Sequence, residues 1–83
     1  MLKRVAIIGL GLIGGSVASG LRRQNIEVVA FDQDESNLQQ GLELGVIDRA
    51  AASIGDAVRD VDLVLIAVPV LAMVPVLTAI KTA

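Results

Sequence analysis

The chain has 83 residues, which is enough for one small domain. Its net charge of −2 provides no basic field for a polynucleotide or an anionic membrane surface, so we expect neither as a partner. Cysteine and histidine are both absent, which excludes a disulfide framework, a thiolate nucleophile and an imidazole base, and we expect no metal site.

Hydrophobic residues make up 54% of the chain, more than the roughly 45 to 50% of a self-contained globular domain. Because large apolar patches are rare on soluble monomers, we expect the excess apolar surface of this chain to be covered, either by further chain after residue 83 or by a second copy. We favour further chain. The first residues do not have the pattern of a secretory leader, and we expect a cytoplasmic protein.

The first part of the sequence alternates apolar runs with helical patterns. Val5–Ile8 is a short β-branched run, typical of a strand buried on both faces. Glu27–Phe31 is a second such run, and the polar cluster that begins at Asp32 ends it. Between them, a helix is predicted from residue 12 to about residue 24, because apolar residues recur every four positions, at Ile13, Val17 and Leu21.

A second helix is predicted from residue 34 to about residue 44. Asp34 is a suitable N-cap, and Gly45 is placed to end the helix in a left-handed conformation. Leu38 and Leu42 are expected to face inward. A brief edge strand at Val46–Ile47 would then fit the alternation of elements.

The last part of the sequence contains a short helix, a strand and a longer helix. Ser53 has an acidic residue three positions later, the form of a capping box, and predicts a short helix through Val58. Leu63–Val68 is a strongly apolar strand, which Pro69 ends because proline has no amide for the ladder. A helix is predicted over residues 73–80, with Pro75 tolerable in its first turn.

The uncharged stretch from residue 63 to residue 80 also has the minimum length of a membrane span. Its two prolines divide it into a β-branched part and a helical part. This division favours a buried parallel strand that turns into a helix, and we expect no membrane segment.

Strands and helices that alternate along a chain form parallel sheets. Right-handed crossovers place the second and third strands on one side of the first strand, and the strand at Leu63–Val68 on the other side. We therefore predict an α/β fold with a doubly wound parallel sheet of order 3-2-1-4. The sheet is truncated, because no further strand follows beside Leu63–Val68.

The sequence from residue 9 to residue 14 has the pattern Gly-x-Gly-x-x-Gly between a predicted strand and a predicted helix, the context that gives this motif its meaning. Gly9 allows the tight turn, Gly11 lets the backbone approach a pyrophosphate, and Gly14 lets the helix pack closely on the strand. Together with Leu12 and Ile13, these glycines are the predicted cofactor-binding turn of a Rossmann-type domain. An ordinary tight turn is the structural alternative.

Asp32 lies 18 residues after Gly14, at the end of the second strand, where this fold places a carboxylate for the adenine ribose hydroxyls. The same carboxylate would repel a 2′-phosphate, and no cation follows it in the next three positions, so we predict NAD rather than NADP. Val68 and Pro69 lie at the edge where ligands of open sheets bind and are also predicted cofactor residues. In the structural alternatives, Asp32 only starts a turn and Pro69 only ends a strand.

Residues 7–16, Ile-Ile-Gly-Leu-Gly-Leu-Ile-Gly-Gly-Ser, resemble the opening of prephenate and arogenate dehydrogenases. Residues 42–48 and 67–70 resemble two later stretches of that family in the same order. The resemblance implies an NAD-dependent enzyme of tyrosine biosynthesis that decarboxylates prephenate or arogenate oxidatively. It further implies that residues 1–83 are the N-terminal part of the dinucleotide-binding domain, and that a helical C-terminal domain forms a homodimer.

The resemblance also implies that the catalytic histidine and the substrate-binding arginine lie beyond residue 83. We therefore assign no catalytic residue and expect the chain to be inactive alone. One alternative is another β-hydroxyacid-type dehydrogenase, and a second is a regulatory domain that binds NAD without turnover. A third is that these 83 residues bind no nucleotide, because the strands that would enclose the nicotinamide are absent.

Overall fold

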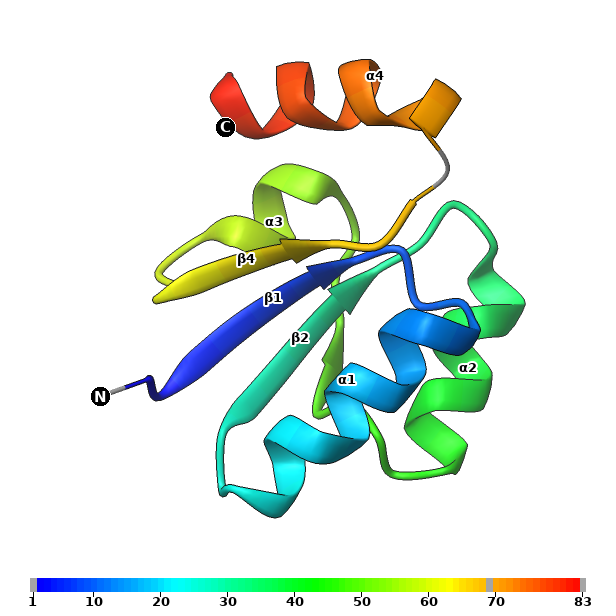
Figure 1. Ribbon diagram of the computed structural model, residues 1–83, viewed down its shortest axis with the longest axis vertical. Coiled ribbons are helices and arrows are strands. Elements are labelled where there is room, and N and C mark those ends of the chain that lie inside the picture. Colours follow the sequence, from blue (N-terminus) through cyan, green and yellow to red (C-terminus); the bar gives the residue numbers. More distant parts are fainter. Residues whose placement is uncertain (1, 69, 83) are drawn as a thin grey trace.

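The computed structural model describes residues 2–68 and 70–82, except the side chains of residues 12, 13 and 70–73 (Figure 1). Strands and helices alternate along the chain as predicted. In order they are β1 (Arg4–Ile8), α1 (Leu12–Arg23), β2 (Glu27–Phe31), α2 (Glu35–Glu43), β3 (Arg49–Ala50), α3 (Ile54–Val58), β4 (Leu63–Ile66) and α4 (Val70–Lys81).

All neighbouring strands pair in parallel, and their order is β3-β2-β1-β4. Figure 1 shows β1 between β4 and β2. Within this sheet Val5 lies opposite Val28 of β2 and Leu63 of β4. The prediction of a doubly wound α/β fold with the order 3-2-1-4 is confirmed.

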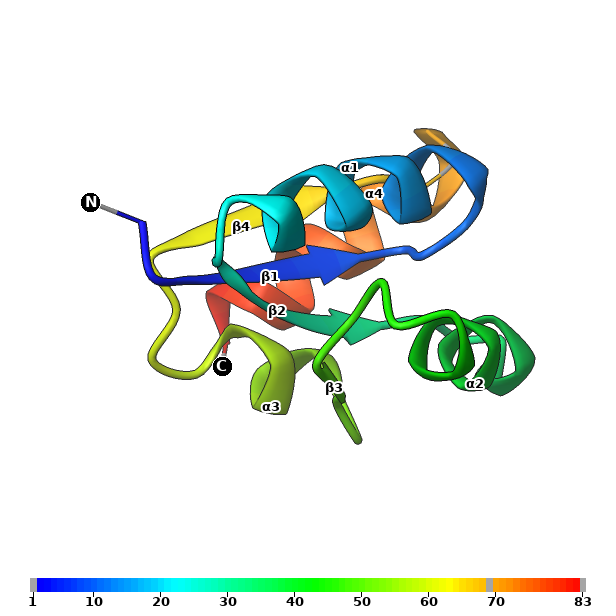
Figure 2. The same ribbon diagram turned by 90° about the horizontal axis from the view of Figure 1, so that it is seen from below.

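The apolar run of β1 is continuous because each face of the sheet is covered. Val5 and Ile7 belong to one core cluster, which includes Ala18 of α1 and Leu38 of α2. Their chain neighbours Ala6 and Ile8 belong to a second cluster on the other face, which α3 and α4 cover. Figure 2 shows α1 and α3 on opposite sides of the sheet. Alternating side chains of a strand point to opposite faces, so a strand at the centre of two layers is apolar at every position.

The inward faces of α1 and α2 differ from the prediction at one residue in each helix, Val17 in α1 and Leu42 in α2. Val17 is 39% exposed and Leu42 is 41% exposed, although both were expected to face the core. The buried neighbours are the small residues Ala18 and Gly41. Leu38 is buried as predicted, so the inward stripe is not displaced as a whole; small residues lie where the helices approach the core most closely.

The edge strand is also displaced from its predicted place. It forms at Arg49–Ala50 and not at Val46–Ile47. The amide of Val46 donates to the carbonyl of Gly41, so the chain is still leaving α2 there, and Ile47 is buried in the core. Pairing with β2 begins only where the amide of Asp48 donates to the carbonyl of Val28.

The end of the chain differs from the prediction in two boundaries. β4 ends at Ile66 and not at Val68, although the amide of Ala67 still donates to the carbonyl of Ile8. The helix α4 begins at Val70, so Pro75 is its sixth residue and not part of its first turn. A proline there costs one amide-to-carbonyl bond, and the rest of the apolar helix is retained. Within residues 2–68 and 70–82, no helix has the length and apolar character that a bilayer crossing requires.

The predicted helix caps are confirmed. The side chain of Asp34 accepts a hydrogen bond from the amide of Ser36, and the hydroxyl oxygen of Ser53 accepts one from the amide of Asp56. Gly45 has a φ of +71°, the left-handed conformation expected after α2. These caps fix where α2 and α3 begin, and so fix the loops that follow β2 and β3.

Candidate functional site

The turn between β1 and α1 needs glycine at two of its three motif positions. Gly9 has a φ of +93°, and a Cβ there would lie 2.5 Å from the carbonyl oxygen of Ala67. A Cβ on Gly14 would collide with the carbonyl oxygen of Gly9. Both glycines therefore allow close packing of backbone on backbone, as the sequence motif predicted.

Gly11 differs from the other two glycines, because a Cβ there would meet no atom within 4 Å. It is the N-cap residue of α1, and no side chain caps this helix start. The first turn of α1 contains no acidic residue. The turn thus has open space in front of a helix start with a positive partial charge, an arrangement suited to an anionic group.

The carboxylate of Asp32 connects the glycine turn to the start of α2. Its Oδ2 atom accepts a hydrogen bond of 2.8 Å from the amide of Leu10 and one of 3.2 Å from Nδ2 of Asn37. Its Oδ1 atom accepts one of 2.9 Å from the amide of Asp34. Asp32 is therefore held by three donors, one each from the glycine turn, the loop after β2 and the first turn of α2.

Leu10, the variable residue inside the glycine motif, anchors the turn in the core. Its side chain is buried and belongs to the cluster that contains Leu38 and Ile47. A Cβ on Gly41 would lie 2.6 Å from Cδ2 of Leu10, so α2 approaches the turn most closely at a residue that has no side chain. The motif treats this position as unrestricted; the apolar residue and the glycine within a helix were the signals that could have revealed the contact.

The turn and the ends of three strands enclose one pocket of about 280 Å³. The pocket is lined by residues that follow β1, β2 and β4. It therefore lies at the carboxyl ends of the parallel strands, where ligands usually bind in this class of sheet. Its lining includes Gly9, Gly11, Phe31, Asp32, Asn37 and Val68.

The structure brings together four predicted site residues in this pocket: Gly9, Gly11, Asp32 and Val68. Gly14 lies behind the turn, in contact with β1. The backbone of Leu12 and Ile13 forms the start of α1, but their side chains lie outside the described residues, and so does Pro69. Sequence reasoning missed Asn37 and Phe31, because nothing in the order of residues shows which side chains from α2 and β2 reach the pocket.

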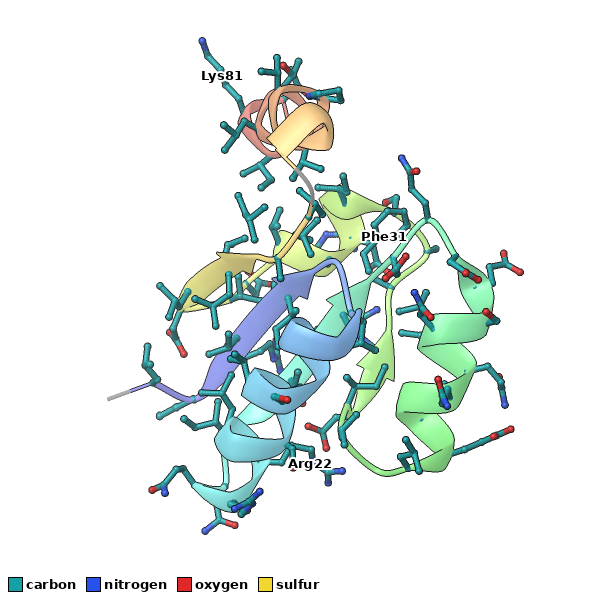
Figure 3. All side chains as sticks on the ribbon, turned by 45° about the vertical axis from the view of Figure 1, so that its right-hand side comes forward. Arg22, Phe31 and Lys81 are labelled. Atoms are coloured by element: carbon teal, nitrogen blue, oxygen red, sulfur yellow. The ribbon has the colours of Figure 1, made fainter. Side chains whose placement is uncertain are left out.

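No lysine or arginine lines the described part of this pocket. Arg22 lies at the other end of α1, where it forms an ion pair of 3.1 Å with Asp48 and donates to the carbonyl of Gly45. Figure 3 shows Arg22 near the bottom of the molecule and Phe31 well above it, near the middle. Among residues 2–68 and 70–82 no group of acidic side chains is arranged to bind a metal ion. The described part of the pocket presents backbone and apolar groups, the amide side chains of Gln33 and Asn37, and the carboxylate of Asp32.

A family model described as "NADP oxidoreductase coenzyme F420-dependent" matches residues 4–83. The chain is 41% identical over 75 residues to a cyclohexadienyl dehydrogenase of Zymomonas mobilis, which covers 88% of the chain and 26% of that protein. It is also 37% identical over 57 residues to the Ktr system potassium uptake protein C of Bacillus subtilis, which covers 69% of the chain and 24% of that protein. The chain thus spans about a quarter of the length of these curated relatives.

Two solved structures have the same fold. Arogenate dehydrogenase of Synechocystis superimposes with a TM-score of 0.88 at 23% identity, over 95% of this chain and 28% of that one. Prephenate dehydrogenase of A. aeolicus, solved with hydroxyphenyl propionate and NAD+, superimposes with a TM-score of 0.80 at 28% identity, over 92% of this chain and 28% of that one. The resemblance predicted from residues 7–16, 42–48 and 67–70 is confirmed.

Proposed function

This chain belongs to the family described as NADP oxidoreductase, coenzyme F420-dependent, and from that premise we propose that it binds the ADP half of NAD for a dehydrogenase of the prephenate and arogenate type. The observation that carries the proposal is the pocket in which the glycine turn faces the carboxylate of Asp32. When bound, NAD would accept a hydride, and the chain itself would bind and orient the dinucleotide.

The pyrophosphate is assigned to the turn at Gly11. The space in front of Gly11 is open, and the uncapped amides at the start of α1 can donate to phosphate oxygens without a lysine. Gly9 and Gly14 contribute by allowing the turn to pack, and Leu12 and Ile13 by beginning the helix. Val68 and Pro69, which follow β4, are assigned to the wall of the same site.

Asp32 is assigned to the adenine ribose. A carboxylate at this position accepts hydrogen bonds from the ribose hydroxyls and repels a 2′-phosphate, which carries about −1.5 to −2 charges near neutral pH. No cation lines the described part of the pocket to offset that repulsion. The family description names NADP, whereas the relative from A. aeolicus was solved with NAD+, and the charge of the pocket favours NAD.

Calorimetric titration of the chain with NAD and NADP, repeated on Asp32→Ala, tests this proposal. We expect NAD to bind more tightly than NADP, and Asp32→Ala to weaken NAD binding by about tenfold to a hundredfold, since hydrogen bonds to a charged group contribute about 1.5–3 kcal/mol. A folded chain that binds neither nucleotide, or that prefers NADP, would contradict the proposal. The chain lacks tryptophan and tyrosine, so calorimetry is preferable to intrinsic fluorescence.

At the level of the whole protein, we propose that residues 1–83 are the N-terminal part of a larger dinucleotide-binding domain. A following helical domain would then complete the site for prephenate or arogenate and form a homodimer, in a cytoplasmic enzyme of tyrosine biosynthesis. Reduction of NAD by a longer protein that contains this chain, with prephenate or arogenate present, tests this extension.

A regulatory nucleotide-binding domain is the second candidate, because the chain is also similar to the potassium uptake protein C of Bacillus subtilis, which is not named as a dehydrogenase. Such a domain would bind the dinucleotide through the same turn and carboxylate. The two candidates differ in turnover: tight binding of NAD by the longer protein, without reduction in the presence of either substrate, would favour the regulatory function.

A further inference from the structure

Asn37 lines the pocket, although it belongs neither to the glycine motif nor to the predicted ribose-binding position, which is Asp32. It lies in the first turn of α2, lines the pocket and donates from Nδ2 to Oδ2 of Asp32 at 3.2 Å. We propose that Asn37 is a positioning residue that holds the carboxylate of Asp32 toward the ribose and so helps to select NAD over NADP. This inference rests on the proposed function.

The hydrogen bonds of Asp32 show what Asn37 contributes. A carboxylate has about four acceptor sites, two on each oxygen. Oδ2 already accepts from the amide of Leu10 and from Asn37, whereas among the described residues Oδ1 accepts only from the amide of Asp34. The free acceptor capacity is therefore on Oδ1, and a ribose hydroxyl that enters the pocket is directed to that atom.

The three donors of Asp32 also differ in kind. The amides of Leu10 and Asp34 belong to the backbone, and no substitution at those positions removes them except proline. Asn37 donates from a side chain, so residue 37 is the place where the sequence sets how firmly Oδ2 is held. Without this donor, the carboxylate has more freedom to turn when a 2′-phosphate approaches, which reduces the repulsion.

A purely structural role is the competing explanation, because Asn37 also lies in the first turn of α2. Its backbone amide donates to the carbonyl of Asp34 whatever the side chain is. Gln39, two residues later, supplies a matched control: it is an exposed amide side chain of the same helix and lines neither this pocket nor the adjoining hollow that Asn37 also lines.

The test is calorimetric titration of wild type, Asn37→Ala and Gln39→Ala with ADP and with 2′-deoxy-ADP. We expect Asn37→Ala to raise the Kd for ADP by about threefold to tenfold, the fold-change that corresponds to one hydrogen bond. The Kd for 2′-deoxy-ADP should change much less, because the hydroxyl that the carboxylate would bind is absent. Gln39→Ala should change neither value.

The same variants are then titrated with NAD and NADP. Asn37→Ala should lower the ratio of NADP to NAD dissociation constants by about threefold to tenfold, because the carboxylate is no longer fixed against the 2′-phosphate. Asn37→Leu, which keeps a similar volume but loses the donor without adding a charge beside Asp32, is the second variant if Asn37→Ala does not fold by circular dichroism. It should also weaken ADP more than 2′-deoxy-ADP.

Equal losses for ADP and 2′-deoxy-ADP would show a structural role and overturn the inference. If Asn37→Ala changes neither the nucleotide affinities nor the ratio of NADP to NAD dissociation constants, the inference is overturned as well. The proposed function would still stand in that case, provided that the wild type prefers NAD. Failure of the folded wild type to bind any of the four nucleotides would instead overturn the proposed function, and this inference with it.

Discussion

At the amino-terminal end of the sheet, Asp62 accepts hydrogen bonds from the amides of Lys3 and Arg4; at the carboxyl-terminal end, Asp32 accepts one from the amide of Leu10. Both carboxylates thus tie a strand end to a neighbouring loop. Their surroundings differ. The hollow beside Asp62 includes Lys3 and Arg4 themselves, whereas the described part of the pocket beside Asp32 contains no cation.

The same kind of hydrogen bond, from a backbone amide to an aspartate, therefore has a structural role at one end of the sheet and belongs to a candidate binding site at the other. A carboxylate that holds a backbone amide stabilises either end of the sheet. Only at the carboxyl-terminal end does the carboxylate also face a pocket next to an uncapped helix start.

The largest effect is expected at the glycine turn. Gly14→Ala places a methyl group against the carbonyl oxygen of Gly9, and neither backbone can move easily, so the free energy of unfolding should fall by about 1–3 kcal/mol or more. Urea denaturation followed by circular dichroism measures it. Gly20→Ala is the matched control, because it lies in the same helix with nothing within 4 Å of its Cβ position; it should raise stability by roughly 0.5–1 kcal/mol. Similar losses in both variants would contradict the packing argument.

A smaller effect is expected at the amino-terminal end, and it depends on pH. The amides of Arg4 and Lys3 lower the pKa of the Asp62 carboxyl. The charged form therefore stabilises the fold above the unfolded pKa of about 3.9, and this contribution is lost as the pH falls through the lower folded value. Asp62→Asn should lower the urea midpoint at pH 7 and have little effect at the lowest pH, without weakening NAD binding. A loss of NAD affinity at pH 7 would contradict the separation of the two ends.

The smallest effect on stability is expected at the contact between α2 and the glycine turn. In Gly41→Ala, the new methyl group meets the flexible end of Leu10, while alanine gains about 1 kcal/mol of helix propensity, so the free energy of unfolding should change by less than about 1 kcal/mol. NAD affinity should nevertheless fall severalfold, because Leu10 donates the amide that holds Asp32. Urea denaturation and calorimetric titration of the same sample measure the two quantities. An unchanged affinity for NAD would show that the glycine turn does not depend on the contact between Leu10 and residue 41.

The order of elements was predictable from the sequence because the information is local. Continuous β-branched runs such as Val5–Ile8 have few other uses than a buried parallel strand, and alternation with helices then fixes the strand order. The prediction of the edge strand at Val46–Ile47 was wrong because the position of so short a strand depends on where it pairs with β2. The apolar residues at 46 and 47 pack in the core and do not pair with β2.

The candidate site was predictable where the backbone decides and unpredictable where side chains meet. Gly9, Gly14 and Asp32 have positions that the strand-turn-helix geometry dictates. The contacts of Asp32 with Asn37 and of Leu10 with Gly41 join segments whose relative placement depends on how closely α2 approaches the turn. No spacing rule in a single sequence gives that distance.

The bond between Leu10 and Asp32 has one further consequence, for the entropy of binding. A loop that becomes ordered only when its ligand arrives loses affinity, because roughly 1–2 kcal/mol of backbone entropy is lost for each residue that is fixed. Here folding itself fixes the glycine turn, since Leu10 is buried and its amide is bonded to the carboxylate. A dinucleotide would therefore meet a rigid surface, and we expect association to proceed without a slow rearrangement step.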